Sequence, residues 1–161
     1  MYNQEIKVGI ADMKMARQEG VLITHALGSC IGIVFWDKQI KLGAMVHIML
    51  PEATAGATNK FKFGDTGVEE TLKKLAVFGG QPSRYMCKIA GGAQMFPTGG
   101  NAGSLGNIGQ RNIESVKAAL LKAHIPIVRE DVGKNFARTM SMDVATGEVK
   151  IRMAGGKEYP L

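Results

Sequence analysis

The stretch CIGIVFWD, from Cys30 to Asp37, and the stretch LGAMVHIML, from Leu42 to Leu50, decide the fold of this chain. Both are rich in β-branched, aromatic and other apolar residues, a composition typical of β-strands. Because only a short connector separates them, we predict an antiparallel hairpin with Lys38 and Gln39 at its tip. The position of the tip fixes which residues of the two strands lie opposite each other.

This register places a thiol and an imidazole on the same face of the hairpin. Cys30 is predicted to lie directly opposite His47, and opposed side chains of an antiparallel pair have Cβ atoms about 4.5 to 5.5 Å apart. Gly32 and Gly43 lie on that face and leave room for another backbone or a substrate. A slip of one residue would turn His47 to the other face, which is apolar and is predicted to face the core. The apolar face consists of Ile31, Ile33, Phe35, Leu42, Ala44 and Val46.

The remaining elements predict a mixed α+β fold. Further strands are expected over residues 21–27, 85–90, 125–132, 138–144 and 148–153, and helices over residues 66–78 and 108–124. Pro126 favours an edge position for its strand, and the last two strands are expected to form a hairpin. Thr66 and Glu69 have the spacing of a capping box at the start of the first helix. We therefore predict an α/β chain of the mixed α+β type, a layered mixed β-sheet with two main helices.

Length and composition indicate a single soluble domain. The chain has 161 residues, of which 45% are hydrophobic and 21% charged, and one domain over residues 1–161 is expected at this size. No apolar run approaches the roughly 18 residues of a membrane-spanning helix, and the polar N-terminus differs from a signal peptide. We expect a cytoplasmic protein without direct membrane insertion.

Charge and cysteine content exclude several other functions. The net charge of +6 favours an acidic partner. The basic residues are scattered and lack interleaved aromatic residues, so nucleic acid is not expected as a partner. Neither C-x-x-C nor H-x-x-x-H spacing occurs around the two cysteines, Cys30 and Cys87. We therefore expect reduced thiols and no metal site.

Cys30 with His47 opposite it has the parts of a nucleophilic cysteine site. A free thiol has a pKa near 8.5 and needs a base to become the thiolate, and an imidazole can accept its proton and later donate it to a leaving group. Thr24 is a candidate to orient the ring, if its strand lies beside the hairpin. The turn at Gly28 and Ser29 could leave backbone N–H groups, including that of Cys30, free to bind an oxyanion. Packing is the alternative role for Cys30, because free cysteines are among the most buried residues.

Six short motifs are spread along nearly the whole chain. They are THALGSCIGI (residues 24–33), GAMVHIMLP (43–51), KFGDT (62–66), KIAGGA (88–93), IGQRN (108–112) and EDVGKN (130–135). Together they closely resemble the CheD family of chemoreceptor glutamine deamidases. The resemblance implies a fold similar to that of deamidating bacterial toxins, with a papain-like catalytic hairpin.

The resemblance to CheD also implies a reaction and the residues that perform it. It implies a triad of Cys30, His47 and Thr24 that converts glutamine side chains on the cytoplasmic helices of methyl-accepting chemotaxis receptors to glutamate. Ammonia leaves as a thioester forms on Cys30, and no metal or organic cofactor is needed. A further implied partner is CheC, a phosphatase of the response regulator. The alternative is a non-catalytic regulator that binds receptors and CheC, and transamidation to an amine is a third possibility.

Three other features receive structural interpretations. His25 is expected to point to the strand face opposite Thr24. Cys87 lies in a predicted strand and is interpreted as a packing residue. The glycine-rich run from Gly99 to Gly109 lacks the spacing of a phosphate-binding loop and is interpreted as a loop that leads into the second helix.

Overall fold

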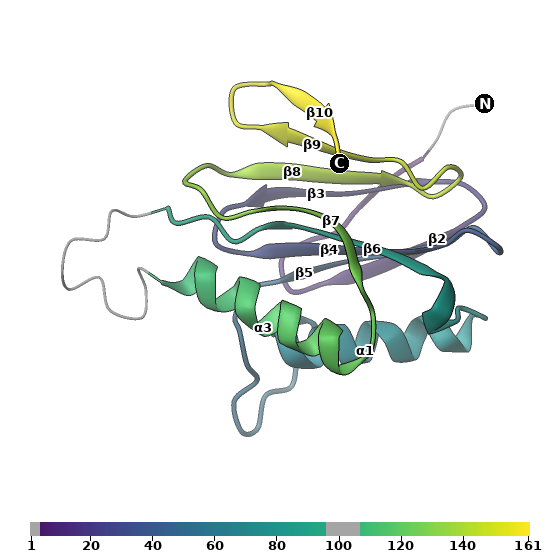
Figure 1. Ribbon diagram of the computed structural model, residues 1–161, viewed down its shortest axis with the longest axis horizontal. Coiled ribbons are helices and arrows are strands. Elements are labelled where there is room, and N and C mark those ends of the chain that lie inside the picture. Colours follow the sequence, from purple (N-terminus) through teal and green to yellow (C-terminus); the bar gives the residue numbers. More distant parts are fainter. Residues whose placement is uncertain (1–3, 96–106) are drawn as a thin grey trace.

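The computed structural model describes residues 4–95 and 107–161. Its strands form two five-stranded sheets, which are stacked on each other, and two long helices cover the far side of one of them (Figure 1). The helices are α1 (Gly64–Val77) and α3 (Ile108–Lys122), and two short 3-10 helices span Lys60–Lys62 and Pro82–Arg84. The predicted mixed α+β class with two main helices is confirmed. No helix in the described part of the chain is long and apolar enough to cross a membrane.

The sheet next to the helices, here called the central sheet, has the strand order β2-β5-β4-β6-β7. Its strands are β2 (Met13–Arg17), β4 (Ile31–Asp37), β5 (Leu42–Ile48), β6 (Tyr85–Gly91) and β7 (Ile127–Val132). All neighbours are antiparallel except β6 and β7, which are parallel. The edge position that Pro126 predicts for β7 is confirmed.

The second sheet, here called the outer sheet, has the order β1-β3-β8-β9-β10. Its strands are β1 (Glu5–Lys7), β3 (Val21–Leu27), β8 (Arg138–Asp143), β9 (Val149–Met153) and β10 (Glu158–Pro160). β1 and β3 are parallel, and the other neighbours are antiparallel. The hairpin predicted near the C-terminus is confirmed as β8 and β9.

The β4–β5 hairpin is present, but its predicted register was wrong by two residues. Asp37 pairs with Leu42, and His47 lies opposite Gly32 rather than opposite Cys30. The turn spans residues 38–41 and is longer than predicted, and within it the carboxylate of Asp37 accepts a hydrogen bond from the backbone N–H of Gln39 at 3.1 Å. A shift of two residues preserves the face of every side chain, so the predicted division of the hairpin into two faces survives.

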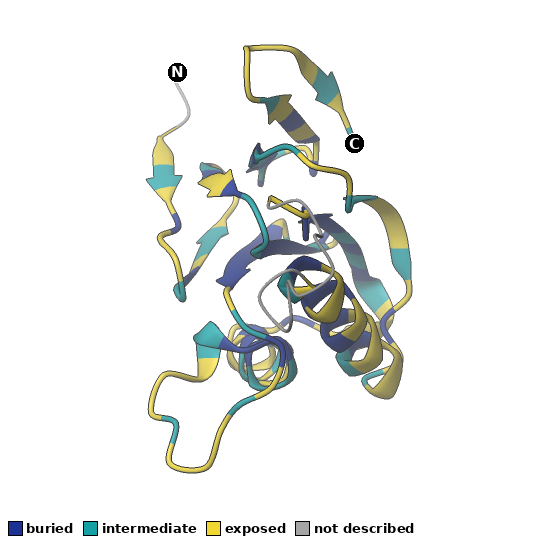
Figure 2. Ribbon diagram, turned by 90° about the vertical axis from the view of Figure 1, so that its left-hand side faces the viewer, coloured by how far each residue is buried: buried dark blue, intermediate teal, exposed yellow. Residues whose placement is uncertain are grey.

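The two faces of the central sheet contact different layers. The apolar face predicted from the sequence packs under the helices, in a core that includes Phe35, Val46, Leu75 and Val116. The other face packs against the outer sheet, in a core that includes Met45. In Figure 2 the inner strands of the central sheet, β4, β5 and β6, and the inner sides of the helices are mostly buried, whereas the outer sides of the helices are exposed. The face predicted to carry the site therefore lies between the two sheets.

Helix α1 begins two residues before the predicted capping box, which is a correction to the sequence analysis. Its N-cap position is Phe63, which makes no side-chain cap, and Thr66 instead donates its hydroxyl hydrogen to the carbonyl oxygen of Lys60 at 2.6 Å. Asp65 in the first turn accepts hydrogen bonds from the backbone N–H groups of Ala53 and Thr66. A negative charge at this end is also favourable to the helix dipole.

Three strands were not predicted, and one predicted loop is mostly not described. β1, β2 and β10 are short and lack a continuous apolar run in the sequence. The strands, predicted as one layer, divide between two sheets because β3 pairs with β8 rather than with the hairpin. Most of the run from Gly99 to Gly109 lies outside the described residues, and helix α3 begins within its last residues.

Candidate active site

Cys30 lies in the turn between β3 and β4, immediately before the first residue of β4. Two backbone hydrogen bonds of 2.8 Å fix the turn: Ala93 N–H donates to Gly28, and Gly92 N–H donates to Cys30. The thiol is partly exposed and packs against the core between the two sheets. It therefore combines a fixed backbone with an accessible side chain.

His47 lies near the end of β5, and its side chain is completely buried. Its Nδ1 atom is 2.7 Å from Oγ1 of Thr24, which is also buried. Thr24 comes from β3 of the outer sheet. Thr24 was a candidate on the condition that its strand lies beside the hairpin, but the contact instead crosses the interface between the two sheets.

The hydrogen bonds around Thr24 define the tautomer of His47. The Thr24 hydroxyl donates to the carbonyl oxygen of Val8 at 2.7 Å, so its oxygen is an acceptor for the ring. His47 must then carry its proton on Nδ1 and donate it to Thr24, which leaves a lone pair on Nε2. That Nε2 atom is buried and has no hydrogen-bond partner in the described residues. It is the atom of the ring that can accept a proton.

Gly32, opposite His47, allows the two sheets to approach at this point. A Cβ atom at position 32 would lie 3.0 Å from atoms of both Leu27 and Met140 and 3.5 Å from a carbon of Thr24. These contacts come from the outer sheet. The glycine predicted to admit another backbone or a substrate therefore admits the sheet that carries Thr24.

Cys30 and His47 lie on one face but are not hydrogen-bonded. His47 is opposite Gly32, and Cys30 precedes the first residue pair of the ladder, Ile31 with Ile48, so the thiol is not directly opposite the imidazole. Hydrogen bonds between catalytic groups are often long without substrate and tighten when it binds. The lack of a hydrogen bond between Cys30 and His47 in the described residues is therefore compatible with the nucleophile and base roles predicted from the sequence.

Burial keeps both groups neutral at neutral pH. Loss of solvent raises the pKa of the Cys30 thiol above its usual value, and burial lowers the pKa of His47 from 6.5 to about 4, because each environment disfavours the charged form. A stable thiolate–imidazolium pair is not expected under these conditions. His47 is instead suited to act as a general base at the moment of attack.

The buried imidazole makes stability dependent on pH. Unfolded His47 accepts a proton near pH 6.5 and folded His47 only near pH 4, so the unfolded state binds more protons between these values. We expect the free energy of unfolding to fall by roughly 3 kcal/mol as the pH decreases from 6.5 to 4. Urea titrations at several pH values measure this loss. In His47→Gln the loss over the same interval should be clearly smaller, with carboxylates such as Asp37 accounting for the remainder near pH 4, and an equal slope in both proteins would contradict the assignment.

Replacement of Thr24 by valine tests the contact between the sheets. Valine keeps the shape but leaves His47 Nδ1–H without an acceptor and the Val8 carbonyl without a donor. We expect a loss of about 2 kcal/mol in unfolding free energy and a 10- to 100-fold fall in the activity proposed below. Thr24→Ser is the matched control, because it keeps the hydroxyl. Equal kinetics in Thr24→Val and the wild type would exclude a role for this hydroxyl in orienting the ring.

The turn before β4 also contains a backbone N–H group without an acceptor in the described ranges. The Cys30 carbonyl is paired with Gly92, but the Cys30 N–H has no acceptor among the residues in the described ranges. The preceding residue, Ser29, is partly buried, and its carbonyl oxygen accepts a hydrogen bond from Asn112 at 2.8 Å. This geometry is compatible with the oxyanion role considered for the turn from the sequence.

Two further residues agree with their predicted roles, and two contacts of the site were not predicted from the sequence. His25 is exposed while Thr24 is buried, and Cys87 is fully buried with a pKa raised to about 12 by burial. The contacts of Val8 and Asn112 with the site were not predicted, because neither side-chain chemistry nor spacing reveals them. Within the described ranges, no three side chains of metal-ligating type come together.

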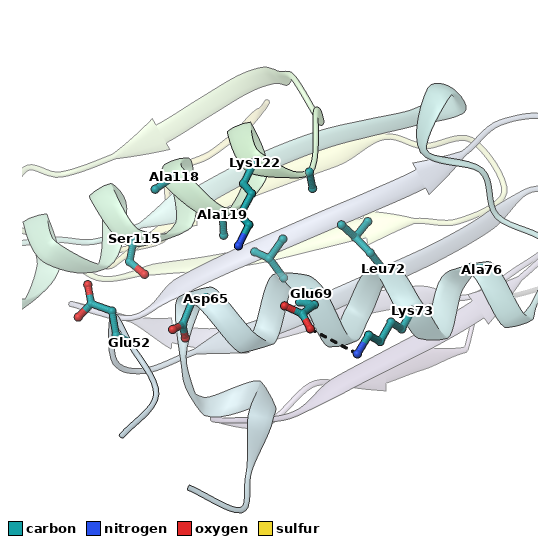
Figure 3. Close-up of a pocket in the computed structure, with 12 residues that line it drawn as sticks. Glu52, Asp65, Glu69, Leu72, Lys73, Ala76, Ser115, Ala118, Ala119 and Lys122 are labelled. Carbon is teal, nitrogen blue, oxygen red and sulfur yellow. Dashed lines mark ion pairs between the residues drawn. The ribbon is translucent and has the colours of Figure 1, made fainter. Parts of the chain in front are cut away.

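A groove of about 670 Å³ lies between α1 and α3, away from these residues. Its lining includes Leu72, Ala119 and Lys122, and Figure 3 shows the ion pair between Glu69 and Lys73 at its edge. Neither cysteine nor histidine lines the groove. The groove is therefore separate from the residues predicted to form the active site.

His47 is buried, its Nδ1 atom contacts the Thr24 hydroxyl, and its Nε2 atom has no partner among the described residues. With the Cys30 thiol on the same sheet face, these groups are the kind that a cysteine-nucleophile site requires. Comparisons with known proteins all indicate one family. The family model "CheD chemotactic sensory transduction" matches residues 49–153, a segment that begins after His47. Longer matches to curated proteins include Cys30, Thr24 and His47 within their extent.

Three of these relatives illustrate the similarity, each named "Probable chemoreceptor glutamine deamidase CheD". The protein of Desulforamulus reducens is 46% identical over 95% of this chain and 93% of the relative. That of Moorella thermoacetica is 44% identical over 94% and 92% of the two chains. That of Caldanaerobacter subterraneus subsp. tengcongensis is 41% identical over 99% of both. The chain belongs to the CheD family.

Proposed function

We propose that this protein is a protein-glutamine deamidase that converts glutamine side chains of methyl-accepting chemotaxis receptors to glutamate and releases ammonia. The observation that carries the proposal is the state of His47. Its Nδ1–H is bonded to Thr24, and its buried Nε2, on the face that also carries Cys30, has no hydrogen-bond partner in the part of the chain that the structure describes. The names of the relatives support the same activity and substrate.

In the first step Cys30 is the nucleophile and His47 is the base. As the substrate carboxamide approaches, His47 Nε2 accepts the thiol proton and the sulfur attacks the carboxamide carbon. Negative charge develops on the amide oxygen, and backbone N–H groups of the turn at Ser29 and Cys30 stabilise it. Thr24 accepts the Nδ1–H hydrogen bond and stabilises the imidazolium as it forms.

In the second step the carbon–nitrogen bond breaks and the nitrogen leaves as ammonia. The imidazolium of His47 donates its Nε2 proton to the leaving nitrogen, and a thioester to Cys30 remains. Water then attacks the thioester while His47 accepts one of its protons, and the proton returns to the departing Cys30 sulfur. The products are a carboxylic acid side chain and ammonia. Side chains and water account for each proton, so the proposed steps use no metal or organic cofactor.

The reaction needs the chain as one unit. Cys30 and His47 come from the turn before the central sheet and from that sheet, whereas Thr24 comes from the outer sheet. We therefore propose a single deamidase domain over residues 1–161. A cytoplasmic location, where thiols stay reduced, is part of this proposal, because both cysteines are free.

Mass spectrometry of a receptor cytoplasmic fragment tests the proposed activity. The fragment is incubated with the wild-type protein, and each glutamine-containing peptide is examined for conversion of the amide to the acid, with ammonia release measured in parallel. We expect conversion at defined glutamines together with stoichiometric ammonia. Incorporation of an added amine in place of acid would identify transamidation, and no reaction at any glutamine would reject the proposal.

The second candidate function is regulation by binding receptors and a CheC-type phosphatase without catalysis. The observation in its favour is that burial raises the pKa of the Cys30 thiol, and that within the described residues the thiol makes no hydrogen bond to His47 that would offset this. Under this function, Cys30→Ala protein would bind the receptor fragment and CheC and would support signalling as the wild type does. Loss of signalling in a Cys30→Ala protein that still binds both partners would reject it.

A further inference from the structure

The side chain of Asn112 connects helix α3 to two backbone segments of the candidate site, one next to Cys30 and one next to His47. It lies in the second turn of α3 and is completely buried. Its side-chain Nδ2 group donates one hydrogen bond to the carbonyl oxygen of Ser29 at 2.8 Å and another to that of Met49 at 3.1 Å. Both partners are acceptors, so the group that faces them must be the NH₂ group and not the amide oxygen.

The two carbonyls belong to the segments that carry the nucleophile and the base. Ser29 immediately precedes Cys30, and Met49 follows His47 by two residues. One side chain from a helix therefore fixes the turn before β4 relative to the end of β5. Gly109, three residues earlier in α3, seats the helix closely, because a Cβ atom there would overlap the carbonyl oxygens of Gly92 and Ala93.

The contact with Ser29 also sets the direction of a backbone donor. The Ser29 carbonyl and the Cys30 N–H belong to one planar trans peptide group, so they point in opposite directions. When Asn112 holds the carbonyl, it fixes the direction of the N–H, and a hydrogen bond to the carbonyl strengthens the N–H as a donor. The Cys30 N–H has no acceptor among the residues described by the structure.

Burial of the Asn112 side chain lowers the stability of the fold, and packing alone does not explain why an asparagine occupies this position. Its Oδ1 atom is buried and has no hydrogen-bond partner within the described part of the chain. An unpaired buried acceptor lowers stability, whereas an apolar side chain at this position would avoid that loss. Groups that break a packing rule in this way are expected at functional sites.

We propose that Asn112 is a positioning residue of the deamidation site, which aims the Cys30 N–H at the oxyanion and holds the nucleophile turn against the base strand. The inference rests on the proposed deamidase function. Asn112 itself does not touch the reacting atoms. Its loss should therefore slow the formation of the tetrahedral intermediate more than it weakens substrate binding.

The test compares Asn112→Ala and Asn112→Asp with Ser115→Ala. Ser115 lies one turn later on α3 and donates to the carbonyl of Pro51 at 2.6 Å, so its replacement removes a comparable buried hydrogen bond outside the site. Deamidation of the receptor fragment gives kcat and KM. Alkylation of Cys30 by iodoacetamide is the second measurement, because it needs the thiolate but forms no oxyanion. Circular dichroism reports folding, and Asn112→Asp keeps the side-chain volume if the alanine variant is unstable.

For both Asn112 variants we expect kcat to fall about 10- to 100-fold, with KM and the alkylation rate within about threefold of wild type. Ser115→Ala should keep all three values. A folded Asn112 variant with wild-type kcat, or with kcat and alkylation reduced in proportion, would overturn the inference while the deamidase function stands. A wild-type protein that reacts with iodoacetamide but deamidates nothing would remove the function and the inference together.

Discussion

Replacement of Cys30 by alanine is expected to lower the rate of glutamine deamidation by about 10⁴- to 10⁶-fold, to the level of the buffer reaction. The thiol forms the covalent intermediate, and no other described cysteine lies on the same face of the central sheet: Cys87 belongs to the core beneath the helices. Peptide mass spectrometry of the receptor fragment over long incubations measures the loss. Thermal unfolding should change little, because the Cys30 side chain is only partly buried.

Cys87→Ala is the matched control for this prediction. It removes the other thiol of the chain, which is fully buried and has a pKa raised to about 12 by burial, so it should keep wild-type kcat and lose some stability. The two variants together separate loss of the nucleophile from loss of a cysteine. Measurable turnover by Cys30→Ala would show that another group attacks the amide.

Replacement of His47 by glutamine is expected to have the second largest effect on activity. Glutamine can occupy the buried site and still bond to Thr24, but it cannot carry a proton from the thiol to the leaving nitrogen. We expect kcat to fall about 10³- to 10⁴-fold. The acid limb of the wild-type profile should lie near pH 4, the pKa to which burial lowers His47, with activity lost as the pH falls through that value.

Alkylation of Cys30 distinguishes a general base from a preformed ion pair. Because burial raises the thiol pKa and lowers that of His47, iodoacetamide should react slowly at pH 7 and faster above pH 9. His47→Gln should leave this reaction within about threefold of wild type. A rapid wild-type reaction at pH 6 that disappears in His47→Gln would instead indicate a stable thiolate–imidazolium pair.

The hairpin faces could be predicted from sequence because they depend only on the alternation of residues along a strand. Ile31, Ile33 and Phe35 are apolar and face the helices, and this alternation survives the error of two residues in the register. The register itself could not be predicted, because it depends on how the Asp37 carboxylate holds the turn. The sequence therefore predicted the correct face for the Cys30 thiol and the His47 imidazole, but it wrongly predicted that the two residues lie directly opposite each other.

The contact between Thr24 and His47 was suggested for a reason that the fold does not support. Sequence order favours pairing of neighbouring strands, but β3 pairs with β8, more than 100 residues later in the chain. The choice of Thr24 depended on its hydroxyl, and the resemblance to CheD strengthened it. Asn112 had no such signal, because two hydrogen bonds to backbone carbonyls leave no pattern in the sequence of their acceptors.

The hydrogen bond between Thr24 and His47 joins the two sheets, and this has a consequence for how the protein matures. A folding intermediate with only the central sheet formed would contain the thiol and the imidazole but no partner to set the ring tautomer. Under the proposed mechanism, amide hydrolysis therefore requires both sheets to be docked, because the outer sheet supplies the hydroxyl that sets the tautomer of the base.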